Sequence, residues 1–192
     1  ENTKATVIFS GEGSDEASGS YMYFKNAPNE EDFQEECVRL MKDLCYYDNL
    51  RCDKSTAGAG LEVRVPFLDK DFLEYYMSIK PKMKMPNSYH IEKYLLRKAF
   101  DDDNLLPKEV LWRVKEAMSD GVSSQKRGWF EVIQEMVNNK MTDDEFETIK
   151  AKYSWNPPQL KESAYFREIF NEFYGGFEKT IPYYWLPKWS GD

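Results

Sequence analysis

The sequence predicts an α/β chain that is mostly helical and has one clear β-strand. Residues 6–9 (Thr-Val-Ile-Phe) form a β-branched and aromatic run that leads into a glycine-containing segment, which is typical of a buried strand. Farther along the chain, apolar residues recur at intervals of three and four, which is the period of an amphipathic helix. One strand cannot form a sheet, so we expect its partners outside the chain or in segments with weak strand signals.

Seven helices are expected after this strand. The first lies between Asp32 and Asn49, where the apolar stripe consists of Phe33, Cys37, Leu40, Met41, Leu44 and Cys45. Asp69 is placed to cap the second helix, because its carboxylate can accept a hydrogen bond from the first turn. A third covers residues 91–100, and Pro107 suits the first turn of a short fourth helix.

The other three helices belong to the second half of the chain. An apolar stripe over residues 129–137 predicts the fifth, and a capping box at residues 142–145 begins the sixth. The seventh runs over about residues 161–174 and ends at the glycine pair 175–176. The tail, residues 181–189, holds two prolines and four large aromatic residues. We expect it to be an irregular segment laid back on the domain, because such rings are rarely left in water.

Length and composition exclude several classes of protein. The 192 residues are expected to form one partial domain, residues 1–192. The net charge of −8 argues against nucleic acid as a partner, and no apolar run approaches the roughly 20 residues that cross a membrane. One histidine cannot supply a two-histidine zinc site. The three cysteines fit neither a zinc ribbon nor a disulfide framework, so we expect no disulfide and small buried thiols.

The predicted strand leads directly into an acidic, glycine-containing loop, Ser10-Gly11-Glu12-Gly13-Ser14-Asp15-Glu16. Open α/β sheets bind ligands at the carboxyl ends of their strands, and small residues there let a ligand approach the backbone. Three carboxylates would repel bare phosphate, but Mg²⁺ binds carboxylates and phosphate oxygens together. The loop therefore suits a magnesium–nucleotide complex. The alternative is an acidic helix start, in which Asp15 and Glu16 only complement the helix dipole.

Two further charged clusters could contribute to a site. Residues 61–69 place Glu62 and Arg64 in an apolar stretch, so Arg64 is expected to need a buried partner, for which Glu62 is a candidate. In residues 112–121, Lys115 precedes a Ser-Asp-Gly turn and could reach a phosphate from a loop. Read alone, the first cluster favours a structural ion pair and the second a solvated lysine.

Taken together and in order, these segments resemble the synthetase domain of the glutamine-hydrolysing asparagine synthetase family, in its eukaryotic-type branch. The motifs are the acidic loop, Arg51-x-Asp53-Lys54, the cluster at residues 60–69, Glu92-Lys93-x-Leu-Leu-Arg97, the cluster at 112–121, and the aromatic tail. The resemblance implies the carboxyl-terminal half of an adenine-nucleotide α-hydrolase-like domain with a Rossmann-like parallel sheet.

The family's reaction is what the resemblance implies for function. With ATP and Mg²⁺ it activates the side-chain carboxylate of aspartate, giving β-aspartyl-AMP and pyrophosphate. Ammonia, released from glutamine in a separate amino-terminal domain, then displaces AMP. The expected parent is a cytoplasmic enzyme, and whether it forms a homodimer is left open.

Site roles follow from the resemblance, position by position. Ser10 and Gly11 match residues that touch the nucleotide. Glu12 matches a glutamate that acts in forming and aminating the intermediate, and Asp15 matches an acidic residue near the metal and pyrophosphate.

Three more positions complete the expected site. Lys115 matches a lysine that neutralises charge on the phosphates, and it is the second expected catalytic residue after Glu12. Arg51 and Glu16 match supporting residues of the active-site region.

Parts of the family pattern are missing from the sequence. The chain holds no Ser-Gly-Gly-x-Asp-Ser pyrophosphate loop and no glutaminase domain, and Ser20 stands where relatives usually carry a glycine before the tyrosine. We expect a fragment that is inactive by itself. Two alternatives remain: a scaffold or regulatory fragment, and a β-lactam synthetase-type relative that adenylates another carboxylate.

Overall fold

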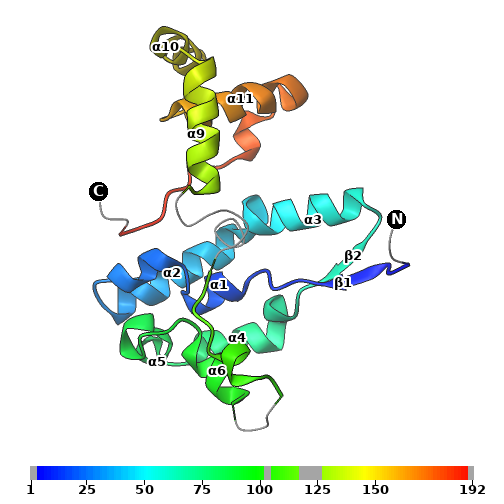
Figure 1. Cartoon of the computed structure of the whole chain (residues 1–192), viewed down its shortest axis with the longest axis vertical. Coiled ribbons are helices and arrows are strands. Elements are labelled where there is room, and N and C mark those ends of the chain that lie inside the picture. The colour runs from blue at the N-terminus through cyan, green and yellow to red at the C-terminus, as the bar shows by residue number, and fades with distance from the viewer. Residues whose placement is uncertain (1–3, 102–104, 117–126, 190–192) are drawn as a thin grey trace. The chain divides into compact units, whose positions relative to one another are not determined.

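The computed structural model describes residues 4–101, 105–116 and 127–189 of the chain (Figure 1). It divides into two compact units. Unit 1 consists of Glu1–Val114 and Leu186–Asp192, and unit 2 of Lys115–Trp185. The predicted Ser-Asp-Gly turn at residues 119–121 lies outside the described residues.

Unit 1 contains a small parallel sheet. Strand β1 (Val7–Phe9) pairs with β2 (Glu62–Arg64), and Ile8 lies opposite Val63 in the register. β2 is therefore a partner with a weak strand signal, which was one of the two expected possibilities. The sequence did not predict β2 at this position, because only one of its three residues is apolar and the strand signal is weak.

The first strand is also less buried than predicted. Val7 is 42% exposed and Phe9 is 78% exposed, so the expectation of a buried strand is wrong for the part of the chain that the structure describes. A sheet of two strands with three residues each has too little area to be covered on both faces.

Helices follow β1 and return the chain to β2, because parallel strands require a crossover connection. In Figure 1 the strands lie side by side at one end of this connection. Its elements are α1 (Ser14–Ser18), η1 (Met22–Asn26), α2 (Glu30–Asp43), η2 (Leu44–Tyr46) and α3 (Asp48–Gly58). The predicted helix between residues 32 and 49 is thus split at the short 3₁₀ turn η2, and α3 was not predicted.

The rest of unit 1 is a series of short helices after β2. They are η3 (Pro66–Leu68), α4 (Lys70–Ser78), α5 (Pro81–Lys84), η4 (Pro86–Ser88), α6 (Tyr94–Ala99) and α7 (Lys108–Leu111). The predicted cap of α4 is confirmed, since Asp69 Oδ1 accepts a hydrogen bond from Phe72 N at 3.0 Å. The predicted third and fourth helices correspond to α6 and α7.

The apolar core of unit 1 lies where α1, η1 and α2 meet. Phe24 and Phe33 are fully buried and pack edge to face, with ring centroids 5.2 Å apart. Cys37 is also buried, and burial raises the pKa of its thiol to about 12. All three cysteines are free; Cys52 is buried as expected, whereas Cys45 is exposed. The core holds α1, and with it the acidic loop, against α2.

Two glycines fix the path of the acidic loop into α1. Gly13 has φ +83°, and a Cβ atom there would lie 2.0 Å from the Leu68 side chain. Gly19 ends α1 with φ +58°, and a Cβ atom there would lie 2.4 Å from the Phe33 ring. Both positions therefore require glycine for conformation and for space.

Unit 2 is a small helical unit. Its elements are α9 (Trp129–Lys140), α10 (Asp143–Lys152), α11 (Lys161–Tyr174) and η5 (Glu178–Thr180). Val137, Met141 and Ala164 form its buried core. The predicted capping box at α10 is confirmed, because Thr142 and Glu145 exchange hydrogen bonds between side chain and backbone.

The end of the irregular tail returns to unit 1. The Trp189 ring packs against Tyr23 and Phe24, with centroids 6.2 and 6.1 Å apart, and Asn26 Nδ2 donates to Trp189 O at 2.9 Å. This confirms that the tail is laid back on the fold. Over the described ranges, no helix combines the length and apolar character needed to cross a membrane.

Candidate functional site

A cavity of about 270 Å³ opens at the carboxyl end of β1. It is lined by residues of the acidic loop, of α1 and of α3, and by Tyr21 just before η1: Ser10, Gly11, Glu12, Gly13, Asp15, Glu16, Tyr21, Asp48 and Arg51. Six of the seven residues predicted from the sequence are in this set. The seventh, Lys115, is the first residue of unit 2, and its contact with phosphates stays a prediction.

The backbone of the loop is anchored to the sheet at one end and to α1 at the other. Ser10 N donates to Arg64 O at 2.9 Å, which extends the strand pairing by one residue. Glu12 N donates to Ser10 Oγ at 3.4 Å, and Ser14 N donates to Gly11 O at 3.3 Å. Gly11 is exposed, and a Cβ atom there would meet no atom within 4 Å. A ligand can therefore approach the backbone closely at Gly11.

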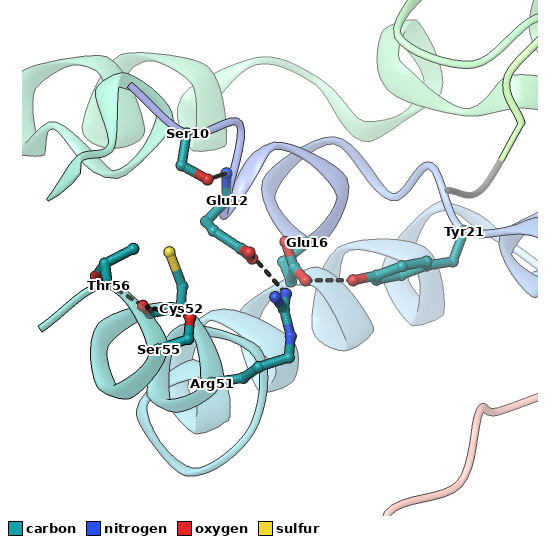
Figure 2. A network of polar contacts seen from close by, with 8 residues as sticks. All are labelled: Ser10, Glu12, Glu16, Tyr21, Arg51, Cys52, Ser55 and Thr56. Atoms are coloured by element: carbon teal, nitrogen blue, oxygen red, sulfur yellow. Dashed lines mark hydrogen bonds and ion pairs between the residues drawn. The ribbon is translucent and has the colours of Figure 1, made fainter. Parts of the chain in front are cut away.

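An ion pair spans the cavity between the loop and α3. Arg51 Nη2 lies 2.6 Å from Glu12 Oε1, and Figure 2 shows the two side chains reaching toward each other. The Glu12 side chain is 16% exposed, whereas that of Arg51 is 66% exposed. The hydrogen bond to Glu12 raises the pKa of Arg51. The pair brings together two residues that are 39 positions apart and that the sequence assigned to the same site.

Glu16 lies at the buried side of the same cavity. Glu16 is only 2% exposed, and Tyr21 Oη donates a hydrogen bond to Glu16 Oε1 (Figure 2). Burial is the largest cause of a raised pKa at Glu16, although the hydrogen bond from Tyr21 opposes it. Burial and the neighbouring Glu16 also raise the pKa of Tyr21. Glu16 therefore supports the site from its floor, and Tyr21 stays protonated beside it.

Asp48 is a cavity residue that the sequence analysis missed. It is the first residue of α3, and burial raises its pKa, followed by repulsion from Glu12. Asp48 precedes Arg51 by three positions, which places both on one face of a helix. That spacing could have identified Asp48 if the helix itself had been predicted.

Asp15 is held by side chains from two other segments. Lys93 Nζ, just before α6, lies 2.9 Å from Asp15 Oδ1 and donates to Ser14 Oγ at 2.8 Å. Ser20 Oγ also donates to Asp15 Oδ1. Lys93 belongs to a motif quoted from the sequence, but no role was assigned to it there.

The cluster around β2 differs from its expectation. Arg64 Nη2 and Glu62 Oε1 form the expected ion pair at 2.5 Å, yet the two side chains are 59% and 58% exposed. The expectation of a buried partner for Arg64 is therefore wrong, because alternate residues of this short strand point to a face that the described residues leave uncovered.

The charges of the cavity favour a ligand that carries a metal ion. Four of the described residues that line the cavity are acidic (Glu12, Asp15, Glu16 and Asp48), and one described lining residue, Arg51, is basic. Over the described ranges, no three or more His, Cys, Asp or Glu side chains are grouped so as to hold a metal by themselves. Mg²⁺ needs only one or two carboxylates when phosphates supply other ligands. The oxygen donors of the cavity therefore fit a Mg²⁺ that arrives with phosphates.

Comparison with known proteins places the chain among its relatives. A family model described as Asparagine synthase matches residues 25–190. The glutamine-hydrolysing asparagine synthetase of Gallus gallus is 49% identical over 189 residues, which cover 98% of this chain and 34% of that protein. The corresponding proteins of Homo sapiens and Bos taurus are 48% and 47% identical, again over 34% of their length. The chain thus spans about a third of the length of the curated relatives that it matches.

The matched range covers most of both units, and the identity to these relatives is far above the level at which shared fold becomes doubtful. The chain belongs to the asparagine synthase family.

Proposed function

We propose that this chain is part of an ATP-dependent asparagine synthetase, and that the cavity beside β1 is where aspartate is activated and amidated. The observation that carries the proposal is the Glu12–Arg51 pair at the carboxyl end of a parallel strand, in a chain of this family. We also propose that β1 and β2 belong to a larger Rossmann-like sheet, since two short strands have exposed faces.

The proposed reaction has two steps. In the first, an oxygen of the aspartate side chain attacks the α-phosphorus of ATP, an O–P bond forms, and pyrophosphate leaves. In the second, ammonia attacks the activated carbonyl carbon of β-aspartyl-AMP, a C–N bond forms, and the C–O bond to AMP breaks. The attacking nitrogen must lose a proton, which a nearby carboxylate can accept.

The chain's own residues have distinct roles in this proposal. Gly11 leaves the loop backbone open to the nucleotide, and Ser10 holds the loop through its contact with Glu12 N. Glu12 is the carboxylate that accepts the proton of ammonia. Arg51 directs the Glu12 side chain into the cavity through their ion pair.

Asp15 would hold Mg²⁺, since it lines the cavity and its side chain is 27% exposed. When bound, the metal neutralises charge on the phosphates of ATP and orients them. Lys115 would add a fixed positive charge on the pyrophosphate side. This role rests on the sequence resemblance alone.

The proposal extends to the rest of the molecule. Ammonia would come from glutamine in a glutaminase domain, and the pyrophosphate loop would lie outside this chain. We call the polypeptide that carries these parts together with this chain the full-length protein. Its cytoplasmic location stays a prediction.

The test is an assay of the full-length protein with ATP, Mg²⁺, aspartate and ammonium chloride. We expect AMP, pyrophosphate and asparagine in equal amounts, and no AMP when aspartate is omitted. AMP formation with a different carboxylic acid and without ammonium would contradict the proposal in favour of a β-lactam synthetase-type reaction. Absence of AMP with every acid would favour the scaffold alternative.

A further inference from the structure

We propose that Lys93 and Ser20 are positioning residues that fix the orientation of Asp15 for metal binding. The inference rests on the proposed function, because it deepens the role given there to Asp15. Its starting point is a juxtaposition in unit 1: two donors from separate segments converge on one carboxylate oxygen, Asp15 Oδ1.

Lys93 holds the start of α1 at two points. Its ammonium lies 2.9 Å from Asp15 Oδ1 and 2.8 Å from Ser14 Oγ, so it ties consecutive residues of the loop–helix junction to the start of α6. The Lys93 and Asp15 side chains are only 21% and 27% exposed. Water therefore screens this pair less than it screens the exposed ion pairs of the same unit.

The backbone of Lys93 is held in an uncommon conformation. Its φ is +58°, in the left-handed region that non-glycine residues rarely occupy and that is enriched at functional sites. The preceding residue anchors it: Glu92 is buried, pairs with Lys25 Nζ at 3.1 Å, and its carbonyl accepts a hydrogen bond from Arg97 Nε at 2.8 Å. These contacts aim the lysine side chain at α1.

Ser20 holds Asp15 from the opposite end of α1. Ser20 is fully buried. Its backbone N donates to Asp15 O at 3.0 Å, and its hydroxyl donates to Asp15 Oδ1. Gly19, with φ +58°, turns the chain so that both contacts form. A glycine in place of Ser20, which the family resemblance leads one to expect, would provide only the backbone contact. The hydroxyl contact therefore depends on the serine side chain.

The two donors support Asp15 without facing the ligand space themselves. The described residues that line the cavity include Asp15 but neither Lys93 nor Ser20. Partners of this kind orient a metal-binding carboxylate, and their loss typically weakens metal affinity or activity by about 10–100-fold. Lys93 and Ser20 thus act through Asp15 rather than on a substrate.

The direction of the effect separates positioning from simple charge. Removing the Lys93 ammonium takes a positive charge away from the site. If charge were the only effect, the loss of Coulomb repulsion would make a metal cation bind more tightly. Loss of orientation would make it bind more weakly. Ser20→Ala changes no charge and deletes one buried oxygen, so it tests orientation directly.

The experiment measures binding of Mn²⁺ to the full-length protein saturated with a non-hydrolysable ATP analogue, by water-proton relaxation. Mn²⁺ prefers the same oxygen ligands as Mg²⁺. We expect Ser20→Ala and Lys93→Met each to weaken Mn²⁺ binding by about 10-fold or more. The Mg²⁺ concentration for half-maximal AMP formation should rise by a similar factor, while binding of the analogue without metal stays unchanged.

Two matched controls remove comparable contacts elsewhere in unit 1. Ser18→Ala deletes a buried hydroxyl of α1 that donates to Ser14 O, and Lys98→Met removes an exposed ion pair of α6 with Asp101. Both should bind Mn²⁺ like the wild type. Thermal melting of all four variants shows whether any loss follows from unfolding.

Unchanged or tighter Mn²⁺ binding in Ser20→Ala or Lys93→Met would overturn the inference, as would equal weakening in the controls. Failure of the proposed function gives a different result. A wild type that binds Mn²⁺ with the analogue but forms no AMP from aspartate would contradict the function, while weaker Mn²⁺ binding in the two variants would still support the positioning role.

Discussion

Burial changes the chemistry of individual carboxyl groups in the cavity, and Glu16 is the clearest example. Glu16 is 2% exposed, and burial raises the pKa of its carboxyl group despite the hydrogen bond from Tyr21. The folded state therefore binds the Glu16 proton more tightly than the unfolded state does. For such a group, stability falls as the pH rises from its ordinary value of 4.5 through the raised value, and the full cost is present above both.

We expect Glu16→Gln to raise the melting temperature at neutral pH, because the amide has no charge to bury and still accepts the hydrogen bond from Tyr21. The gain should shrink as the pH falls and should vanish below the ordinary pKa of 4.5, where glutamate is protonated as well. Melting curves of both proteins across this pH range measure the effect.

Glu31→Gln provides the control, since Glu31 is exposed and near the start of α2. It should shift the melting temperature little at any pH. A gain for Glu16→Gln that is the same at low and neutral pH would contradict the assignment of a burial cost to Glu16.

At the residue scale, sequence alone predicted most of the residues that line the cavity, because they are concentrated in one short loop. Glu12, Asp15 and Glu16 follow a strand, and strand ends are where such sheets bind ligands. Lys93 and Asp48 were missed for a different reason. Each reaches the loop only through the tertiary fold. The motif that contains Lys93 assigned it no role, and the spacing of Asp48 from Arg51 is informative only once α3 is known.

Helix α2 holds a residue, Glu36, that contacts both the segment before the helix and the carboxyl-terminal tail. Glu36 is fully buried, and its carboxylate accepts hydrogen bonds from Tyr23 Oη at 2.8 Å and from Arg39 Nε at 2.7 Å. Lys188 Nζ of the tail lies 3.3 Å from the same group. Burial by itself raises the pKa of Glu36, but the hydrogen bonds from Arg39 and Tyr23 outweigh it and lower the pKa.

We expect Glu36→Ala to lower the free energy of unfolding by about 1.5–3 kcal/mol, the range for a lost hydrogen bond to a charged group. The part of the loss that depends on the charged carboxylate should be fully present above the ordinary carboxyl pKa of 4.5 and should disappear as the pH falls through the lowered value, which leaves the cost of the deleted buried side chain. Urea denaturation at several pH values measures it.

The neighbouring Glu35→Ala serves as the matched control, because Glu35 is exposed on the same helix. Its effect should stay within about 0.5 kcal/mol, as for ordinary surface substitutions. Equal effects of the two substitutions would show that Glu36 does not anchor the tail.

At the element scale, the accuracy of the sequence prediction follows the strength of the local signals. α10 and α11 begin and end where the capping box and the glycine pair predicted. α3 was missed because it buries only Cys52, so it has no apolar stripe. β2 was missed because it has only three residues, one of them apolar, and is too short to show the alternation of apolar and polar residues typical of a strand. The elements that complete the site are thus those with the weakest local patterns.

At the scale of the whole molecule, the predicted carboxylates line a cavity among the described residues, but the chain spans about a third of its relatives' length. Positioning of both reactants supplies a large part of a catalytic rate. We expect the purified 192-residue chain to form no AMP above background with ATP, Mg²⁺, aspartate and ammonium. The full-length protein is the positive control in the same assay, and turnover by the chain alone would contradict this expectation.

The central claim is that the cavity beside β1 performs the amidation, with Glu12 as its proton acceptor. Glu12→Gln in the full-length protein tests it most directly, because glutamine has the same size but accepts no proton at neutral pH. We predict that the variant keeps its melting temperature and its glutaminase activity while asparagine formation is lost. Asparagine formation at the wild-type rate, or a parallel fall of melting temperature and both activities, would contradict the claim.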